Sequence, residues 1–167
     1  MGMEGLGMRS PYIAVVGAGN CPDEMAEIAA EVGREIARKG AVLVCGGLEG
    51  VMAAAARGAK EIGGFTVGIL PGPQTSDANE YIDFPIATNM GQARNAIIVQ
   101  TADVLISIGG AYGTLSEIAM ALKIGKGVVS LLLRFQVQGV LPAQTPIEAV
   151  SEALTLIELG QNLRNFT

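Results

Sequence analysis

Four glycine-rich turns are the places where this backbone could bind a phosphate group. They lie at residues 17–21, 46–50, 88–91 and 109–114, and each follows a short apolar run. Glycine permits positive φ and close approach to a ligand, and a following helix points free N–H groups at an anion. A single such turn is often only a tight connection, so the prediction rests on their coincidence at one sheet edge. The candidate binding residues are Gly17, Gly19, Gly46, Gly47, Gly50, Asn89, Gly109, Gly110, Ala111, Tyr112, Gly113 and Thr114.

A carboxylate and a guanidinium accompany the last turn as candidate catalytic groups. Glu117 lies four residues after Gly113, in the first turn of the expected helix, where its carboxylate can face the mouth of the site. It could contact a ribose hydroxyl, or stabilise an oxocarbenium-like centre while assisting a water. Arg94 could clamp a phosphate or orient Glu117, and the alternative is a structural ion pair between packed helices. Thr114 is expected at the helix N-cap, where its hydroxyl can bond a helix N–H or a phosphate oxygen.

The residues that are absent narrow the chemistry. The chain has no histidine and two cysteines, Cys21 and Cys45, which removes Ser-His-Asp and Cys-His catalysis and leaves no expected metal site. Both thiols are interpreted as small hydrophobes, with a role beside an oxidation-sensitive cofactor as the alternative. Pro22 replaces the third glycine of a dinucleotide fingerprint, and no Gly-Lys-Ser or Gly-Lys-Thr occurs. NAD binding and ATP hydrolysis therefore have no support.

Short apolar bursts alternate with segments of helical period, which indicates parallel strands joined by crossover helices. We expect a three-layer Rossmann-like α/β fold, with a mostly parallel sheet of six or seven strands and helices on both faces. Strands are expected near 12–16, 41–45, 65–70, 83–87, 103–108 and 128–133. Helices are expected near 23–38, 50–62, 90–101, 114–125 and 146–159. Segments 71–80 and 136–144 are predicted loops, and residues 12–160 one domain between tails at 1–11 and 161–167.

Composition limits the partners. The formal charge of −5, from 11 basic and 16 acidic residues, argues against a broad surface for duplex nucleic acid. No apolar run approaches the roughly 18 residues of a membrane span, and the N-terminus does not match a secretory signal. We expect a cytoplasmic protein that binds a small phosphate-bearing ligand. The apolar segment 94–100 also predicts a homodimer or homotetramer.

Residues 94–117 resemble the signature of the lonely-guy (LOG) phosphoribohydrolases, long mislabelled lysine decarboxylases. That signature is M-H-x-R-K followed by P-G-G-x-G-T-x-x-E, and Arg94, Gly113, Thr114 and Glu117 fall on its arginine, Gly-Thr pair and final glutamate. Residues 46–52 are similar to the glycine-rich turn and helix start of the same superfamily, so the resemblance covers about 12–133.

Departures from the signature indicate a particular branch. Gly91 and Gln92 replace Met-His, Asn95 replaces the lysine, and Gly109 and Ala111 replace the proline and the second glycine. The pattern is closer to uncharacterised nucleotide-binding proteins of this fold and to the molybdenum-cofactor carriers. The resemblance to those carriers implies binding of a phosphate-bearing pterin without turnover.

Three functions are therefore open. The first is binding of a nucleoside monophosphate or a molybdopterin-type cofactor at the carboxyl edge of the sheet. The alternative is a phosphoribohydrolase that cleaves the N-glycosidic bond of cytokinin-type nucleoside 5′-monophosphates. A second alternative is an oligomeric interaction protein without catalysis. Bound nucleotide, phosphate or molybdenum cofactor are the possible cofactors.

Overall fold

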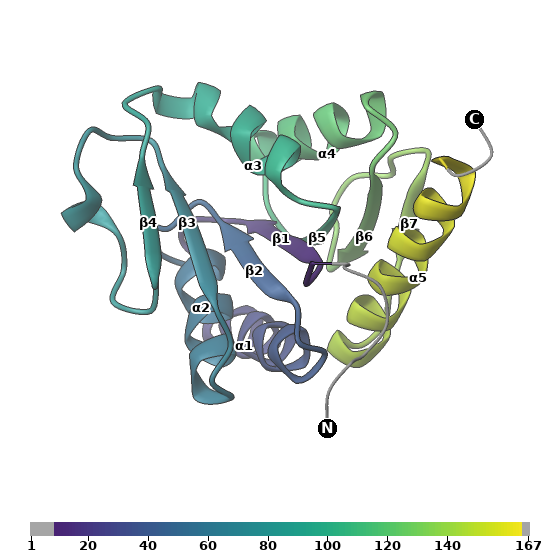
Figure 1. Cartoon of the computed structure of the whole chain (residues 1–167), viewed down its shortest axis with the longest axis horizontal. Helices are drawn as coiled ribbons and strands as arrows, with labels where there is room; N and C mark the ends of the chain where they lie inside the picture. Colours follow the sequence, from purple (N-terminus) through teal and green to yellow (C-terminus); the bar gives the residue numbers. More distant parts are fainter. Residues whose placement is uncertain (1–8, 165–167) are drawn as a thin grey trace.

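A parallel sheet lies between two layers of helices in the structure, a computed structural model (Figure 1). It describes residues 9–164, and of 162–164 only the helical backbone. Within these residues the sheet has seven strands in the order β4-β3-β2-β1-β5-β6-β7, and all neighbours are parallel. The strands are β1 (Tyr12–Gly17), β2 (Val42–Cys45), β3 (Thr66–Leu70), β4 (Phe84–Ala87), β5 (Val104–Ile108), β6 (Gly127–Leu131) and β7 (Val140–Pro142).

Helices cover both faces, so the predicted three-layer α/β fold is confirmed. Helices α3 and α4 lie over one face, and α1, α2 and α5 over the other (Figure 1). The central strands β1, β2, β3, β5 and β6 are largely apolar on both sides because both of their faces are buried, whereas the edge strands β4 and β7 are more exposed. The helices are α1 (Asp23–Arg38), α2 (Val51–Glu61), α3 (Asn95–Thr101), α4 (Tyr112–Lys123) and α5 (Pro146–Arg164), with 3₁₀ turns at Thr75–Asp77 and Gly91–Arg94.

Two glycines bring α1 and α2 into backbone contact. A Cβ at Gly33 would lie 1.9 Å from the carbonyl oxygen of Ala55, and one at Gly58 would lie 1.9 Å from that of Ala30. Only glycine fits at such a crossing. The outer surface of this helix pair carries ion pairs, in which Arg34 contacts Glu27, Glu31 and Glu61.

The structure corrects several predicted boundaries. Segment 136–144 is not all loop, because it contains β7, whose three residues pair with β6. Segment 90–101 is not one helix: the chain makes a 3₁₀ turn before α3 begins at Asn95. Helix α4 begins at Tyr112, two residues before the predicted start.

Ordered structure is also present on both sides of residues 12–160. Helix α5 continues to Arg164, because no helix-stopping residue follows the predicted end and Gly160 alone does not break a helix. At the other end, Arg9 donates two hydrogen bonds to Asp103, at 2.9 and 3.0 Å, although it was placed in a tail. The remaining tail predictions, at 1–8 and 165–167, lie outside the described residues.

Candidate functional site

The candidate site lies between β1 and β5, where the chain changes the side of the sheet to which it adds successive strands. From β1 the chain continues to β2 on one side, whereas β5 and β6 lie on the other. Parallel sheets bind ligands in the crevice beyond the carboxyl ends of the strands at such a point. A cavity of about 430 Å³ lies there. It is lined by Val15, Val16, Gly17, Ala18, Gly19, Gly46, Leu48, Met52, Pro71, Gln92, Arg94, Asn95, Ala111, Gly113, Thr114 and Glu117.

Helix α4 points an uncapped N-terminus at this cavity. Its N-cap residue, Ala111, has no side-chain hydrogen bond, and its first turn contains no acidic residue. The amides of the first turn therefore lack intrahelical acceptors and carry the positive end of the helix dipole. Three other helices differ at their N-termini. Helices α1 and α5 have acidic residues in their first turns, and the first N–H of α2 donates to Ala18 at 3.0 Å.

The glycines of the site divide into two groups. At Gly19 and Gly113 a Cβ would meet no atom within 4 Å, so the backbone there is open to a ligand. At Gly17, and at Gly110 beside the cavity, a Cβ would collide with its surroundings, 2.6 Å from the carbonyl oxygen of Ile108 at the end of β5 and 2.3 Å from the hydroxyl of Thr114 in α4. Glycine at these two positions lets the turns pack against β5 and α4.

Arg94 is buried in the cavity wall with an unused donor. Its side chain donates to the carbonyl oxygen of Gly46 at 3.4 Å and to the amide oxygen of Asn95. Its Nε has no hydrogen-bond partner within residues 9–164. Burial lowers the pKa of Arg94, and the nearby Glu117 offsets part of this effect. A buried N–H without a partner costs free energy, which an anionic ligand could recover.

Glu117 lines the same cavity and is only 6% exposed. Its carboxylate accepts no hydrogen bond from any described residue, and it does not form a direct ion pair with Arg94. The structural Arg–Glu ion pair, which was the alternative interpretation of these two residues, is therefore not present among the described residues. Burial raises the pKa of Glu117 to about 7, against the attraction of Arg94. Near neutral pH the group can thus accept or donate a proton.

The cavity includes part of the residue set predicted from the sequence. Its lining contains Gly17, Gly19, Gly46, Arg94, Ala111, Gly113, Thr114 and Glu117, and does not contain Gly47, Gly50, Asn89, Gly109, Gly110 or Tyr112. Asn89 is an exposed turn residue at φ 52° whose N–H donates to Gly72 at 2.9 Å. Thr114 is not the N-cap: α4 begins at Tyr112, two residues before the predicted start, so Thr114 is the third residue of the helix, where it is buried. Glu117 consequently lies in the second turn of the helix.

Sequence reasoning missed several residues of the wall. Asn95 is buried beside Arg94, and Pro71 reaches the cavity from the loop after β3. Asn95 could have been identified from the sequence, because it replaces the lysine of the LOG signature. No feature of the sequence indicated Pro71, because its position depends on the path of the loop. Asn79 attaches this loop to the turn after β2 by donating to Leu48 at 2.7 Å.

Neither cysteine has the environment of a reactive thiolate. Cys45 is fully buried beneath the site, and burial raises its pKa to about 11. Cys21 is partly buried, and burial together with Asp23 raises its pKa. No group of side chains in residues 9–164 is arranged to hold a metal ion, and none of the helices described there is long and apolar enough to cross a membrane.

Solved structures with this fold include molybdenum-cofactor proteins. The chain is similar to the molybdenum cofactor binding protein of Rippkaea orientalis, with a TM-score of 0.85 and 36% identity over 90% of this chain and 99% of that one. It is also similar to the molybdenum cofactor carrier protein of Chlamydomonas reinhardtii, with a TM-score of 0.83, 35% identity and the same coverage.

Sequence relatives extend this comparison. An uncharacterized protein of Archaeoglobus fulgidus is 51% identical over 148 residues, which is 89% of this chain and 97% of that protein. The cytokinin riboside 5′-monophosphate phosphoribohydrolase of Mycobacterium tuberculosis is 38% identical over 98 residues, 57% of this chain and 52% of that enzyme. The sequence model of the SLOG cluster4 family matches residues 10–161. The chain therefore belongs to the SLOG cluster4 family, in the branch of the LOG-like superfamily that resembles the molybdenum-cofactor carriers.

Proposed function

We propose that the cavity between β1 and β5 binds a phosphate-bearing, nucleotide-like ligand, either a nucleoside monophosphate or a molybdopterin-type cofactor carried as cargo. The observation that carries this proposal is the unpartnered Nε of Arg94, buried in a cavity at the uncapped N-terminus of α4. A helix N-terminus and a guanidinium both favour a phosphate. No other cationic side chain lines the cavity within the described residues.

The remaining wall suits the polar part of such a ligand. The open backbone at Gly19 and Gly113 allows close approach from two sides. Asn95 and Glu117 offer hydrogen-bonding groups to a hydroxyl or a ring edge. An anionic phosphate near Glu117 raises the pKa of the carboxyl further, so binding favours its protonated form, which can donate a hydrogen bond.

The relatives support a carrier more than an enzyme. The two similar structures are described as a cofactor binding protein and a cofactor carrier, and each is matched over almost its whole length. In addition, Glu117 is the only carboxylate that residues 9–164 contribute to the lining of the cavity, whereas glycoside hydrolysis ordinarily uses two.

Titration calorimetry with matched ligand pairs tests the binding proposal. AMP should bind at least about tenfold more tightly than adenosine, and a phosphorylated pterin more tightly than its dephosphorylated form. Adenosine and the dephosphorylated pterin lack the phosphate, so they cannot form its charge-assisted hydrogen bonds. Equal affinity within both pairs would contradict a phosphate site.

The second candidate is hydrolysis of a nucleoside 5′-monophosphate, favoured by the pKa of about 7 at Glu117 and by the phosphoribohydrolase relative. Water would add to C1′ as the N-glycosidic bond breaks, giving ribose 5-phosphate and free base. Incubation with AMP and N6-modified AMP, followed by chromatography of the base, tests it. The carrier proposal expects intact nucleotide. Release of base that Glu117→Gln abolishes would establish the enzyme instead.

We also propose that α3 and α4 form the interface of a homodimer or homotetramer. Their exposed side chains, which include Ala96, Gln100, Ser116 and Ala119, are uncharged apart from Lys123 at the end of α4. A two-fold interface places the same surface on both sides, so an uncharged face avoids like-charge contacts. Light scattering at micromolar concentration should give at least the dimer mass. A dimer without affinity for any phosphorylated probe would favour an interaction protein instead.

A further inference from the structure

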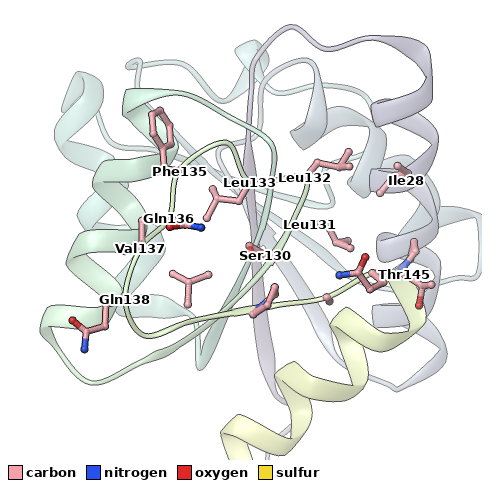
Figure 2. Close-up of a pocket in the computed structure, with 15 residues that line it drawn as sticks. Ile28, Ser130, Leu131, Leu132, Leu133, Phe135, Gln136, Val137, Gln138 and Thr145 are labelled. Carbon is pink, nitrogen blue, oxygen red and sulfur yellow. The ribbon is translucent and has the colours of Figure 1, made fainter.

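A second, larger cavity opens at the same edge of the sheet, beyond the carboxyl ends of β6 and β7. It has a volume of about 890 Å³ and lies outside the candidate site. In Figure 2, Phe135, Gln136, Val137 and Gln138 stand on one side of this groove, and Ile28 and Thr145 on the other. The loop that joins β6 to β7 supplies most of one wall.

The lining of the groove contains no charged side chain. Its polar groups are mainly the side-chain amides of Gln136, Gln138 and Gln144, which have no hydrogen-bond partner among the described residues. Each amide offers both donors and an acceptor. The groove therefore suits an uncharged ligand group that has apolar faces and a polar edge.

An anion is not the expected occupant, because the neighbouring helix N-terminus is already satisfied. The N–H of Glu148 donates to the hydroxyl of Thr145 at 3.1 Å, and the carboxylate of Glu148 accepts from the N–H of Gln144 at 2.7 Å. The N-terminus of α5 is thus capped by side chains, whereas that of α4 is not. The two cavities thus differ in the ligand chemistry that they favour.

An apolar side chain is held at the groove in an unfavourable conformation. Leu132 has φ 56° and remains 53% exposed. Positive φ is uncommon for a residue other than glycine, and a leucine that stays half exposed gains only part of the free energy of burial. Contact between Leu132 and an apolar ring would recover part of this cost.

The groove and the candidate site have no lining residue in common, but an aromatic contact links the segments that line them. Ala111 and Gly113 line the site, and Tyr112 between them is 81% exposed, with its ring centroid 6.3 Å from that of Phe135 in the groove. The turn before them is attached to β6, because the N–H of Gly109 donates to Leu131 at 2.9 Å.

We propose that this groove binds the planar nitrogen heterocycle of the ligand whose phosphate occupies the site at α4, an inference that rests on the proposed function. Phe135 and Leu132 pack against the ring faces, and the glutamine amides pair with the amide-like edge that purines and pterins have in common. The protein therefore recognises phosphate and ring in two adjacent cavities.

Calorimetric titration with a ring-bearing and a ring-free phosphate tests the proposal. GMP, a phosphorylated pterin and ribose 5-phosphate are titrated into the wild type, Phe135→Ala and Gln144→Leu. Phe84→Ala is the matched control, since Phe84 is an exposed aromatic residue on β4, at the opposite edge of the sheet. Gln144 is exposed, so its substitution should leave the fold intact even if Phe135→Ala does not fold.

The groove variants should weaken binding of GMP or the pterin by about tenfold and leave that of ribose 5-phosphate unchanged. The ligand that loses affinity identifies the ring class. If the groove variants leave all affinities unchanged, or weaken ribose 5-phosphate equally, this inference fails while the phosphate site stands. If the wild type binds no phosphorylated probe, the proposed function fails and the inference fails with it.

Discussion

Replacing Glu117 with glutamine is expected to make the protein more stable at pH 8.5, by about 3 kcal/mol, and to leave its stability nearly unchanged at pH 4. The buried carboxyl has a pKa of about 7 in the folded protein, against 4.5 as its ordinary value. Between these two pKa values the unfolded chain releases a proton that the folded chain retains, so the free energy of unfolding falls as pH rises. Above about pH 7 both states are ionised, and the loss is complete.

Denaturant unfolding of both proteins at the two pH values measures this difference. Glu31→Gln is a control of opposite sign, because hydrogen bonds from Arg38 and Arg34 lower the pKa of Glu31. Its stabilising contribution is present above the ordinary pKa and is lost as pH falls, so this variant should be less stable at pH 8.5. If Glu117→Gln is no more stable than the wild type at pH 8.5, the burial assigned to this carboxyl is wrong.

Replacing Arg94 with glutamine should lower the affinity for AMP by about 10- to 100-fold. Arg94 is the only cationic residue in the lining of the cavity among the described residues, and loss of its charge-assisted hydrogen bonds is not compensated by a neighbour. The fold should survive, because Glu117 can become neutral when its positive neighbour is removed. Calorimetry gives the affinity, and thermal unfolding confirms that the variant is folded.

Arg57→Gln is the matched control for this loss. The guanidinium of Arg57 contacts Glu61 and Glu27 on the outer surface of α1 and α2, and it does not line the cavity. The control should bind AMP like the wild type. Unchanged affinity in Arg94→Gln would remove Arg94 from the proposed site.

Much of the fold follows from local patterns in the sequence. The apolar strands β1, β2, β3, β5 and β6 lie within two residues of their predicted ends because each is buried on both faces. Strand β7 could not be predicted: Val140–Pro142 is short, contains proline and depends on pairing with β6. The 3₁₀ turn before α3 was also missed, because its residues are compatible with an ordinary helix.

Those residues of the candidate site that lie on a single helix could be placed from their spacing in the sequence. Gly113, Thr114 and Glu117 lie on one helix, so the sequence was sufficient to place them together. Asn95 and Pro71 enter the cavity through the packing of different segments, which local patterns do not encode. The unpartnered Nε of Arg94 and the raised pKa of Glu117 depend on burial in the assembled fold.

The most direct test of the phosphate site is to map ligand contacts by NMR on ¹⁵N-labelled protein. AMP and a phosphorylated pterin are titrated, with their dephosphorylated forms as controls. The largest chemical-shift changes are expected at the backbone amides of Gly19, Gly113 and Thr114 and at the Nε–H of Arg94, and only with the phosphorylated ligands. Changes confined to other surfaces, or none at millimolar ligand, would contradict a phosphate site at the N-terminus of α4.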